Sequence, residues 1–178
     1  MDLQSYQRSL RRLVIGGAAT PDDPPYAQRL AGSTGLAVVR EVIGFWRAHA
    51  LERYCVLSAG WLKRQGRFEH EISRFIASGE FSPDVAEAGQ QFMRQLSRDS
   101  DPLLQALARF EIALHETRTD PGQYRSVDWP CDPEPILAAI LDGHEPEIAG
   151  KPSPHRVTVS RALPGGYACT ALPEPGSG

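Results

Sequence analysis

Glu111 is a carboxylate at the edge of an apolar helical face, where a charged group needs a partner. It lies within Ser100–Arg118, a stretch that opens with a helix-capping pattern and carries apolar residues at the spacing of one helical face. Those apolar residues are Leu103, Leu107, Phe110 and Leu114. Because an unpaired buried carboxylate is costly, we expect Glu111 either to form a structural ion pair or to act as a general base with a raised pKa.

The ion pair is the favoured role for Glu111, with Arg40 or Arg47 as its partner. The two arginines lie one heptad apart on a second predicted helix, beside its apolar face. That face consists of Val39, Val42, Ile43, Trp46 and Ala50. A general base would instead work with His115 and Arg118, which follow Glu111 at i+4 and i+7. We predict that Glu111 fixes the register of two helices and is not catalytic.

Other residue types capable of chemistry show no recognisable pattern. The five histidines never pair at i+3 or i+4, and the three cysteines show no CxxC spacing, which argues against a metal site and a disulfide framework. Cys55 lies on an apolar face, whereas Cys131 precedes a helix start where a thiolate is stabilised. The sequence therefore predicts no catalytic residue, no metal and no cofactor in this chain.

Two alternating segments near the C-terminus predict a β-hairpin around Pro164-Gly165-Gly166. Because a two-stranded hairpin is marginally stable alone, it must pack on the helices, gain a third strand or offer its edge to another chain. An exposed strand binds an extended peptide by adding it to the sheet. Peptide binding at the hairpin edge is therefore one hypothesis, and coverage of this edge by the protein's own helices is the other.

The periodicity of the whole chain predicts a mainly α fold. A bundle of five or six helices occupies residues 1–120, with a loop at Ala18–Gly32 and a bend near His49. A small α+β module at residues 123–172 follows, with a strand at Arg125–Trp129, a short helix opened by Asp132-Pro133 and the hairpin. Residues 173–178 form a disordered tail.

Charge and hydropathy bound the possible partners. The net charge is −3, but the segment Arg8–Arg74 is basic and the segment from Asp120 to the end is acidic. A DNA-binding or regulatory helical module is therefore the alternative function, although the aromatic residues of the basic helices fall on apolar faces and are expected in the core. No apolar run is long enough to span a bilayer, and the charged start is unlike a secretory signal, so we expect no membrane partner and a cytoplasmic location.

The helix order and two stretches of sequence resemble the HvfC/BufC-type family. One stretch is Leu51-Glu-Arg-Tyr54-Cys-Val-Leu, followed by an aromatic-rich helix through Phe68 and Phe75. The other runs from Pro102 to Glu111 and is similar to the family's Leu-Ala-x-x-Glu helix. The resemblance covers roughly residues 33–120. It departs from the family pattern at Cys55, where a proline is usual.

The resemblance implies a non-catalytic role. The N-terminal domain of such proteins carries a DNA-binding label, and the chain is also similar to partner subunits of methanobactin-type peptide-modifying oxidases. Such a subunit holds the leader of a ribosomally made precursor peptide and docks on a barrel-type iron-dependent oxidase, which oxidises cysteines of the peptide. The implied iron belongs to the partner enzyme. If the resemblance holds, we expect the leader to add to the first strand of the hairpin, through Arg156, Val157, Thr158, Val159 and Ser160.

Overall fold

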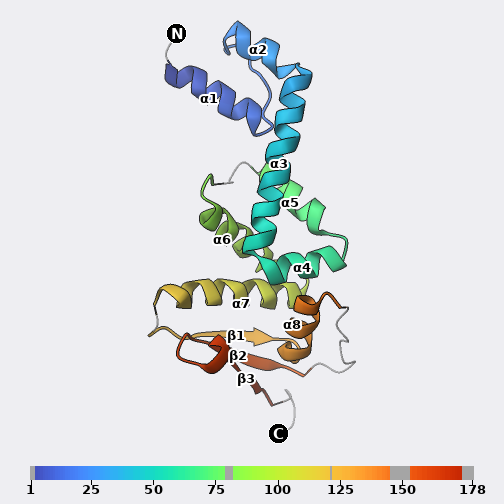
Figure 1. Cartoon of the computed structure of the whole chain (residues 1–178), viewed down its shortest axis with the longest axis vertical. Helices are drawn as coiled ribbons and strands as arrows, with labels where there is room; N and C mark the ends of the chain where they lie inside the picture. The colour runs from blue at the N-terminus through green and yellow to red at the C-terminus, as the bar shows by residue number, and fades with distance from the viewer. Residues whose placement is uncertain (1–2, 79–81, 121, 145–152, 174–178) are drawn as a thin grey trace. The chain divides into compact units, whose positions relative to one another are not determined.

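The computed structural model describes residues 3–78, 82–120, 122–144 and 153–173. Within these residues the chain forms eight α-helices and one three-stranded sheet, which confirms the predicted mainly α fold with a small C-terminal α+β part (Figure 1). The helices are α1 (Leu3–Val14), α2 (Pro25–Ala31), α3 (Thr34–Tyr54), α4 (Val56–Arg64), α5 (Phe68–Ala77), α6 (Val85–Leu96), α7 (Pro102–Thr119) and α8 (Pro133–Asp142). The strands are β1 (Arg125–Trp129), β2 (His155–Val159) and β3 (Tyr167–Ala171). Most of the predicted tail, residues 173–178, lies outside the described residues.

The contacts between elements divide the chain into two compact units. The N-terminal unit comprises Met1–Ala50 and Glu69–Phe81, and the C-terminal unit comprises Leu51–Phe68 and Ser82–Gly178. The predicted boundary near residue 120 is wrong, because α7 packs on β1 and β2 and shares their core. A helix and a sheet that bury one apolar layer together belong to the same unit.

Helices α1, α2 and the beginning of α3 enclose a small apolar core in the N-terminal unit. Leu13, Ala27 and Leu36 are buried there, one from each helix. The prediction of a loop throughout Ala18–Gly32 is wrong, because Pro25 opens α2. Proline suits the first turn of a helix, where its φ is already helical and its missing N–H is not needed.

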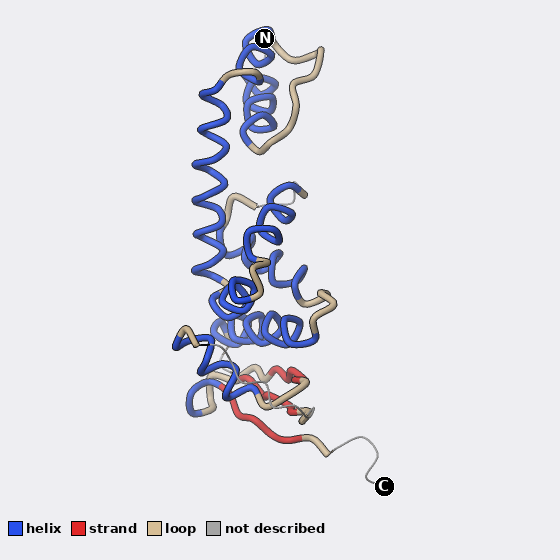
Figure 2. The backbone as a smooth tube through the Cα atoms, turned by 90° about the vertical axis from the view of Figure 1, so that its right-hand side faces the viewer, coloured by secondary structure: helices blue, strands red, loops and turns tan. Residues whose placement is uncertain are grey.

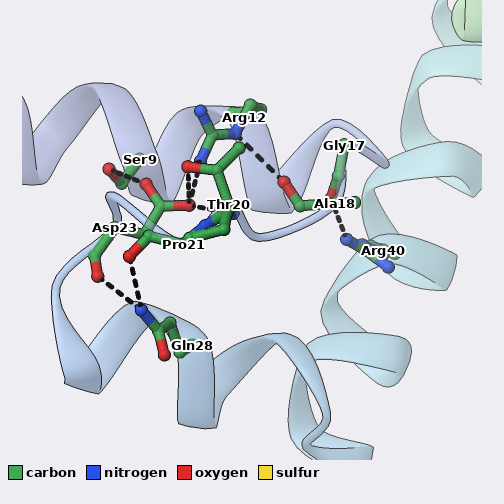
Figure 3. A network of polar contacts seen from close by, with 9 residues as sticks. All are labelled: Ser9, Arg12, Gly17, Ala18, Thr20, Pro21, Asp23, Gln28 and Arg40. Carbon is green, nitrogen blue, oxygen red and sulfur yellow. Dashed lines mark hydrogen bonds and ion pairs between the residues drawn. The ribbon is translucent and has the colours of Figure 1, made fainter.

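The buried carboxylate of Asp23 organises the loop between α1 and α2 (Figure 3). The hydroxyl of Ser9 and the backbone N–H of Thr20 each donate to it at 2.6 Å. Arg12 forms an ion pair with the same carboxylate. The Ser9 hydroxyl, the Thr20 N–H and Arg12 together hold the pKa of Asp23 well below its ordinary value.

Arg40 of α3 is bonded to the end of α1 and the residues that follow it (Figure 3). Its Nε donates to the C=O of Leu13 at 2.7 Å, and its Nη2 donates to the C=O of Gly17 at 2.9 Å. The last carbonyl groups of a helix lack partners within the helix and attract cations. Arg40 therefore joins two helices of the N-terminal unit.

Helix α3 is continuous over Thr34–Tyr54, so the predicted bend near His49 is wrong. Ser33 caps its start, because its Oγ accepts the backbone N–H of Leu36 at 3.2 Å. The apolar pattern changes along the helix because the residues up to Ala50 belong to the N-terminal unit and those from Leu51 belong to the C-terminal unit.

Part of the predicted apolar face of α3 is exposed. Val39, Val42 and Trp46 were expected in the core, yet they are 43%, 49% and 61% exposed. The assignment of aromatic residues to the core is therefore wrong for Trp46, whereas Trp61 of α4 is buried as predicted.

In the C-terminal unit, α4 and α6 pack against α7. Gly89 of α6 admits the ring of Tyr54, since a Cβ at this glycine would lie 2.1 Å from a ring carbon. Arg64 at the end of α4 donates to three carbonyl groups at the C-terminal end of α8. These contacts fix α4 between α7 and α8.

The sheet has the strand order β1–β2–β3 with both pairs antiparallel, so β1 is the third strand that the predicted hairpin required. Its buried side chains are Val127, Trp129, Val157 and Val159. Helix α7 packs on this sheet (Figure 2). The turn Pro164–Gly166 uses two glycines with positive φ, as the predicted Pro-Gly-Gly turn requires.

Candidate functional site

Glu111 of α7 accepts three hydrogen bonds from the N-terminal end of α4. The N–H of Leu57 donates to its Oε1 at 2.8 Å, and the N–H and hydroxyl of Ser58 donate to its Oε2 at 3.0 and 2.6 Å. Cys55, at the N-cap of α4, provides no side-chain acceptor. Glu111 therefore caps α4 from another helix, where the helix dipole also favours a negative charge.

The predicted ion pair between Glu111 and Arg40 or Arg47 is wrong. The donors to Glu111 come from α4, and Arg40 donates to carbonyl groups of the N-terminal unit. Arg47 also belongs to that unit, where burial and the nearby charge of Arg11 lower its pKa. Glu111 is 5% exposed, and burial raises its pKa although its three donors act in the opposite direction. The predicted structural role is retained with different partners.

A largely apolar cleft of about 650 Å³ opens beside Glu111 in the C-terminal unit. Its volume lies in the range of pockets that bind small molecules or peptide side chains. Residues of α4, α7, α8 and the turn before β3 form its walls, together with the last residues of α3. The apolar lining residues are Val56, Leu57, Phe110, Leu114, Leu137, Leu141 and Tyr167.

One wall of the cleft is a stacked pair of rings. The imidazole of His115 lies parallel to the ring of Tyr54 with 4.3 Å between centroids, and its Nε2 lies 3.4 Å from the C=O of Tyr54. Burial lowers the pKa of His115, the contact with the carbonyl oxygen opposes this, and Arg118 lowers it further. His115 is therefore mainly neutral at pH 7 and contributes an aromatic surface.

Arg53 and Arg118 supply the positive charge of the cleft lining. Both are exposed, and within the described part of the chain neither forms a hydrogen bond or an ion pair. Glu111 lines the same cleft, but its oxygens are occupied by α4. Two arginines and one carboxylate leave the cleft lining with a net positive charge.

Strand β3 begins at the cleft and forms one edge of the sheet. Tyr167, its first residue, lines the cleft and packs edge-on against Phe110. The N–H of Leu172, just after β3, donates to the C=O of Pro154 at 2.8 Å. Because hydrogen bonding alternates along an antiparallel strand, the N–H and C=O groups of Tyr167, Cys169 and Ala171 point away from β2.

The prediction of strand addition along Arg156–Ser160 is wrong. β2 pairs with β1 on one side and with β3 on the other, so both of its edges are occupied. Val157, Val159 and Ser160 are buried, and Arg156 forms an ion pair with Asp128 at 2.8 Å. Within the described residues the available edges belong to β1 and β3.

The two outer strands differ in charge. β1 carries Arg125, paired with Glu116 at 2.7 Å, and Asp128, paired with Arg156. β3 contains no charged residue in Tyr167–Ala171. Charged side chains on an edge strand discourage the addition of another strand, so the β3 edge is the one suited to pairing.

The three cysteine thiols resist ionisation. Burial raises the pKa of all three thiols, and neighbouring acidic groups raise it further. The predicted stabilisation of a Cys131 thiolate is therefore wrong, because burial and then the nearby charge of Asp132 raise the pKa of this thiol. The described residues contain no group of three potential metal ligands and no helix able to cross a membrane.

Sequence reasoning identified some of the cleft residues but not the cleft. Glu111, His115 and Arg118 were recognised as a polar group on one helix, and the structure places all three in the cleft lining. Arg53, Tyr54 and Tyr167 complete the site from elements far away in the sequence. No local spacing pattern connects these positions to Glu111.

Comparison of the chain with known proteins gives no indication of its function. No protein-family model, curated protein or solved structure matches it. The function must therefore be argued from the cleft and the strand edge.

Proposed function

We propose that the protein is a non-catalytic accessory subunit that binds a ribosomally made precursor peptide. An extended segment of the peptide pairs with the edge of β3. The observation that carries this proposal is an uncharged strand edge that begins beside an apolar cleft. Backbone pairing supplies affinity in this binding mode, and a neighbouring pocket supplies specificity.

The catalytic partner in this proposal is a cytoplasmic, iron-dependent oxidase of the barrel type, as the sequence resemblance implies. The enzyme holds the iron and oxidises cysteines of the peptide, while this chain holds the leader. The raised pKa values of the cysteines support the assignment of the chemistry to a partner, because thiols that remain protonated are poor nucleophiles.

A library of short random peptides displayed on phage, selected on the immobilised full chain, tests the binding mode. We expect the enriched peptide, once synthesised, to shift the amide NMR signals of Tyr167–Ala171. Ala171→Pro removes one outward N–H from the edge and leaves the β2 ladder intact. Because one backbone hydrogen bond contributes about 1 kcal/mol, we expect this variant to bind roughly fivefold more weakly.

Ser126→Pro is the matched control, because it makes the same change at the outward side of β1. It should leave the affinity unchanged. Enriched peptides that shift signals of β1 or α3, or that bind both proline variants equally well, would contradict pairing at β3.

A second measurement tests the partnership. We expect the full chain to form a stable complex with an iron-dependent barrel oxidase encoded beside it, and the enzyme to modify its peptide only in that complex. A chain that binds no such enzyme, yet binds duplex DNA with an affinity that falls steeply with salt, would favour the regulatory alternative.

A further inference from the structure

We infer that the cleft of the C-terminal unit binds an apolar group that carries a carboxylate. In the peptide this group is a large apolar residue next to an acidic residue. The inference deepens the proposed function and rests on it for the source of the group.

The charge of the cleft selects an anion. Arg53 and Arg118 line the cleft without a hydrogen-bond or ion-pair partner among the described residues, so both guanidinium groups are available to a ligand. Guanidinium groups form strong, directional hydrogen bonds with carboxylates. Glu111 offsets only part of this preference, because two guanidinium groups line the cleft against one carboxylate, whose oxygens accept hydrogen bonds from α4.

The walls of the cleft favour a ligand with a large apolar part. Leu114, Leu137 and Leu141 come from two helices, and Leu141 is 67% exposed at the cleft. The rings of Tyr54 and Tyr167 add aromatic surface. A ligand that covers these groups removes apolar area from water, which stabilises the complex by about 25 cal/mol per Å².

The position of the cleft connects it to the strand edge. Tyr167 is the first residue of β3 and also lines the cleft, and Gly165 lines it without a side chain. A strand that pairs with β3 therefore passes the cleft as it leaves the edge at Tyr167. A side chain at that end of the added strand can enter the cleft while its neighbour reaches an arginine.

Decanoate tests the cleft independently of any peptide. We expect it to shift the amide NMR signals of Tyr54, Leu114 and Tyr167 in the full chain. Arg53→Gln and Arg118→Gln should each weaken decanoate binding about fivefold, as expected for a partly exposed ion pair. Decanol, which has the same chain without the charge, should bind more weakly, and its affinity should be the same in both variants.

Arg98→Gln is the matched control, because Arg98 is an exposed arginine of the same unit that does not line the cleft. Its affinity for decanoate should equal that of the wild type. A peptide selected for the β3 edge gives a second experiment. Replacing its acidic residue by the corresponding amide should weaken its binding about as much as Arg118→Gln in the protein does.

The outcomes separate this inference from the proposed function. If decanoate does not bind, or binds Arg53→Gln and Arg118→Gln as tightly as the wild type, the inference is wrong even when peptides pair with β3. If decanoate binds as expected and no peptide pairs with β3, the cleft is a site for free amphipathic acids and the proposed function is wrong. If replacing the acidic residue of the peptide leaves its affinity unchanged, the carboxylate bound in the cleft does not come from the peptide.

Discussion

Asp23 of the N-terminal unit and Glu111 of the C-terminal unit are both buried carboxylates, but they are stabilised in different ways. Asp23 in the N-terminal unit accepts from Ser9, Thr20 and a cation, Arg12, and its pKa is lowered. Glu111 in the C-terminal unit accepts only from backbone N–H groups and a hydroxyl, and its pKa is raised by burial.

The two carboxylates also differ in how far along the sequence their hydrogen-bond donors lie. The partners of Asp23 lie within 14 positions in the sequence, so a loop and one helix create its site. The partners of Glu111 lie more than 50 positions away, so its site exists only when α4 and α7 have packed. We therefore expect Asp23 to stabilise only the loop and helix around it. Glu111 gains its hydrogen bonds only when the whole C-terminal unit has folded.

The largest expected effect follows from removing the acceptor in the C-terminal unit. Glu111→Leu leaves two backbone N–H groups and the Ser58 hydroxyl buried without an acceptor, so we expect a loss of about 3 kcal/mol in the free energy of unfolding. Urea unfolding followed by the fluorescence of Trp61 and Trp129 measures it. Glu134→Leu, a change at an exposed acid, is the control, and a loss below about 1 kcal/mol for Glu111→Leu would contradict the capping role.

The corresponding contact of the N-terminal unit is Arg40. Arg40→Gln removes one charged hydrogen bond to the end of α1 and one to Gly17 after it, and we expect the unit to lose about 2 kcal/mol. Hydrogen exchange of the α1 amides should accelerate, whereas exchange in α7 should not change. Arg29→Gln, at an exposed position of α2, is the control. Equal acceleration in both variants would show that Arg40 does not hold α1.

Removing one of the three donors to Glu111 should have a smaller effect on stability. Ser58→Ala removes one of the three donors and keeps both backbone N–H groups, so we expect a loss of about 1 kcal/mol. The pKa of Glu111 should rise further, because the hydroxyl favours the ionised form. Carboxyl-carbon NMR titration reads this pKa, and Ser97→Ala is the control for removing an exposed serine hydroxyl. A lower pKa in Ser58→Ala would contradict the assigned donor.

The last prediction separates the two units by pH. The lowered pKa of Asp23 means that its stabilising contribution is complete above its ordinary pKa and is lost as pH falls through the folded value, so the N-terminal unit should weaken below about pH 4. Glu111 has a raised pKa, so its contribution is complete in acid and declines as pH rises through the folded value.

Hydrogen exchange at neutral and acidic pH measures the loss in α1 and α2. Asp23→Asn should remove most of the acid dependence in these helices, and Asp22→Asn, at the exposed neighbouring position, should not. An acid dependence that is unchanged in Asp23→Asn would show that other groups control the N-terminal unit.

Local patterns predicted the elements whose signals are complete within a few residues. The strand Arg125–Trp129 alternates, Asp101 and Pro102 open α7, and Pro-Gly-Gly marks the turn before β3, and the structure places each where the sequence indicated. The helix α2 was missed because prolines and aspartates suit both a loop and a helix start.

The partners of Glu111 and the cleft could not be predicted, because they depend on how distant elements pack. Nothing in the sequence around Glu111 points to the N–H groups of Leu57 and Ser58. The hairpin was predicted, but its strand order was not, and β1 occupies the edge of β2 that was assigned to a peptide. The sequence pattern therefore identified the strands but assigned the free sheet edge to β2, which lies in the centre of the sheet.

An isotope-filtered NOE experiment on the labelled full chain with the selected, unlabelled peptide locates the bound peptide on the protein. We predict cross-strand NOEs between peptide Hα protons and the amide protons of Cys169 and Ala171, together with NOEs from one apolar peptide side chain to Leu114. NOEs confined to β1, or to the exposed face of α3 at Val42 and Trp46, would contradict the assignment of peptide binding to β3 and its cleft.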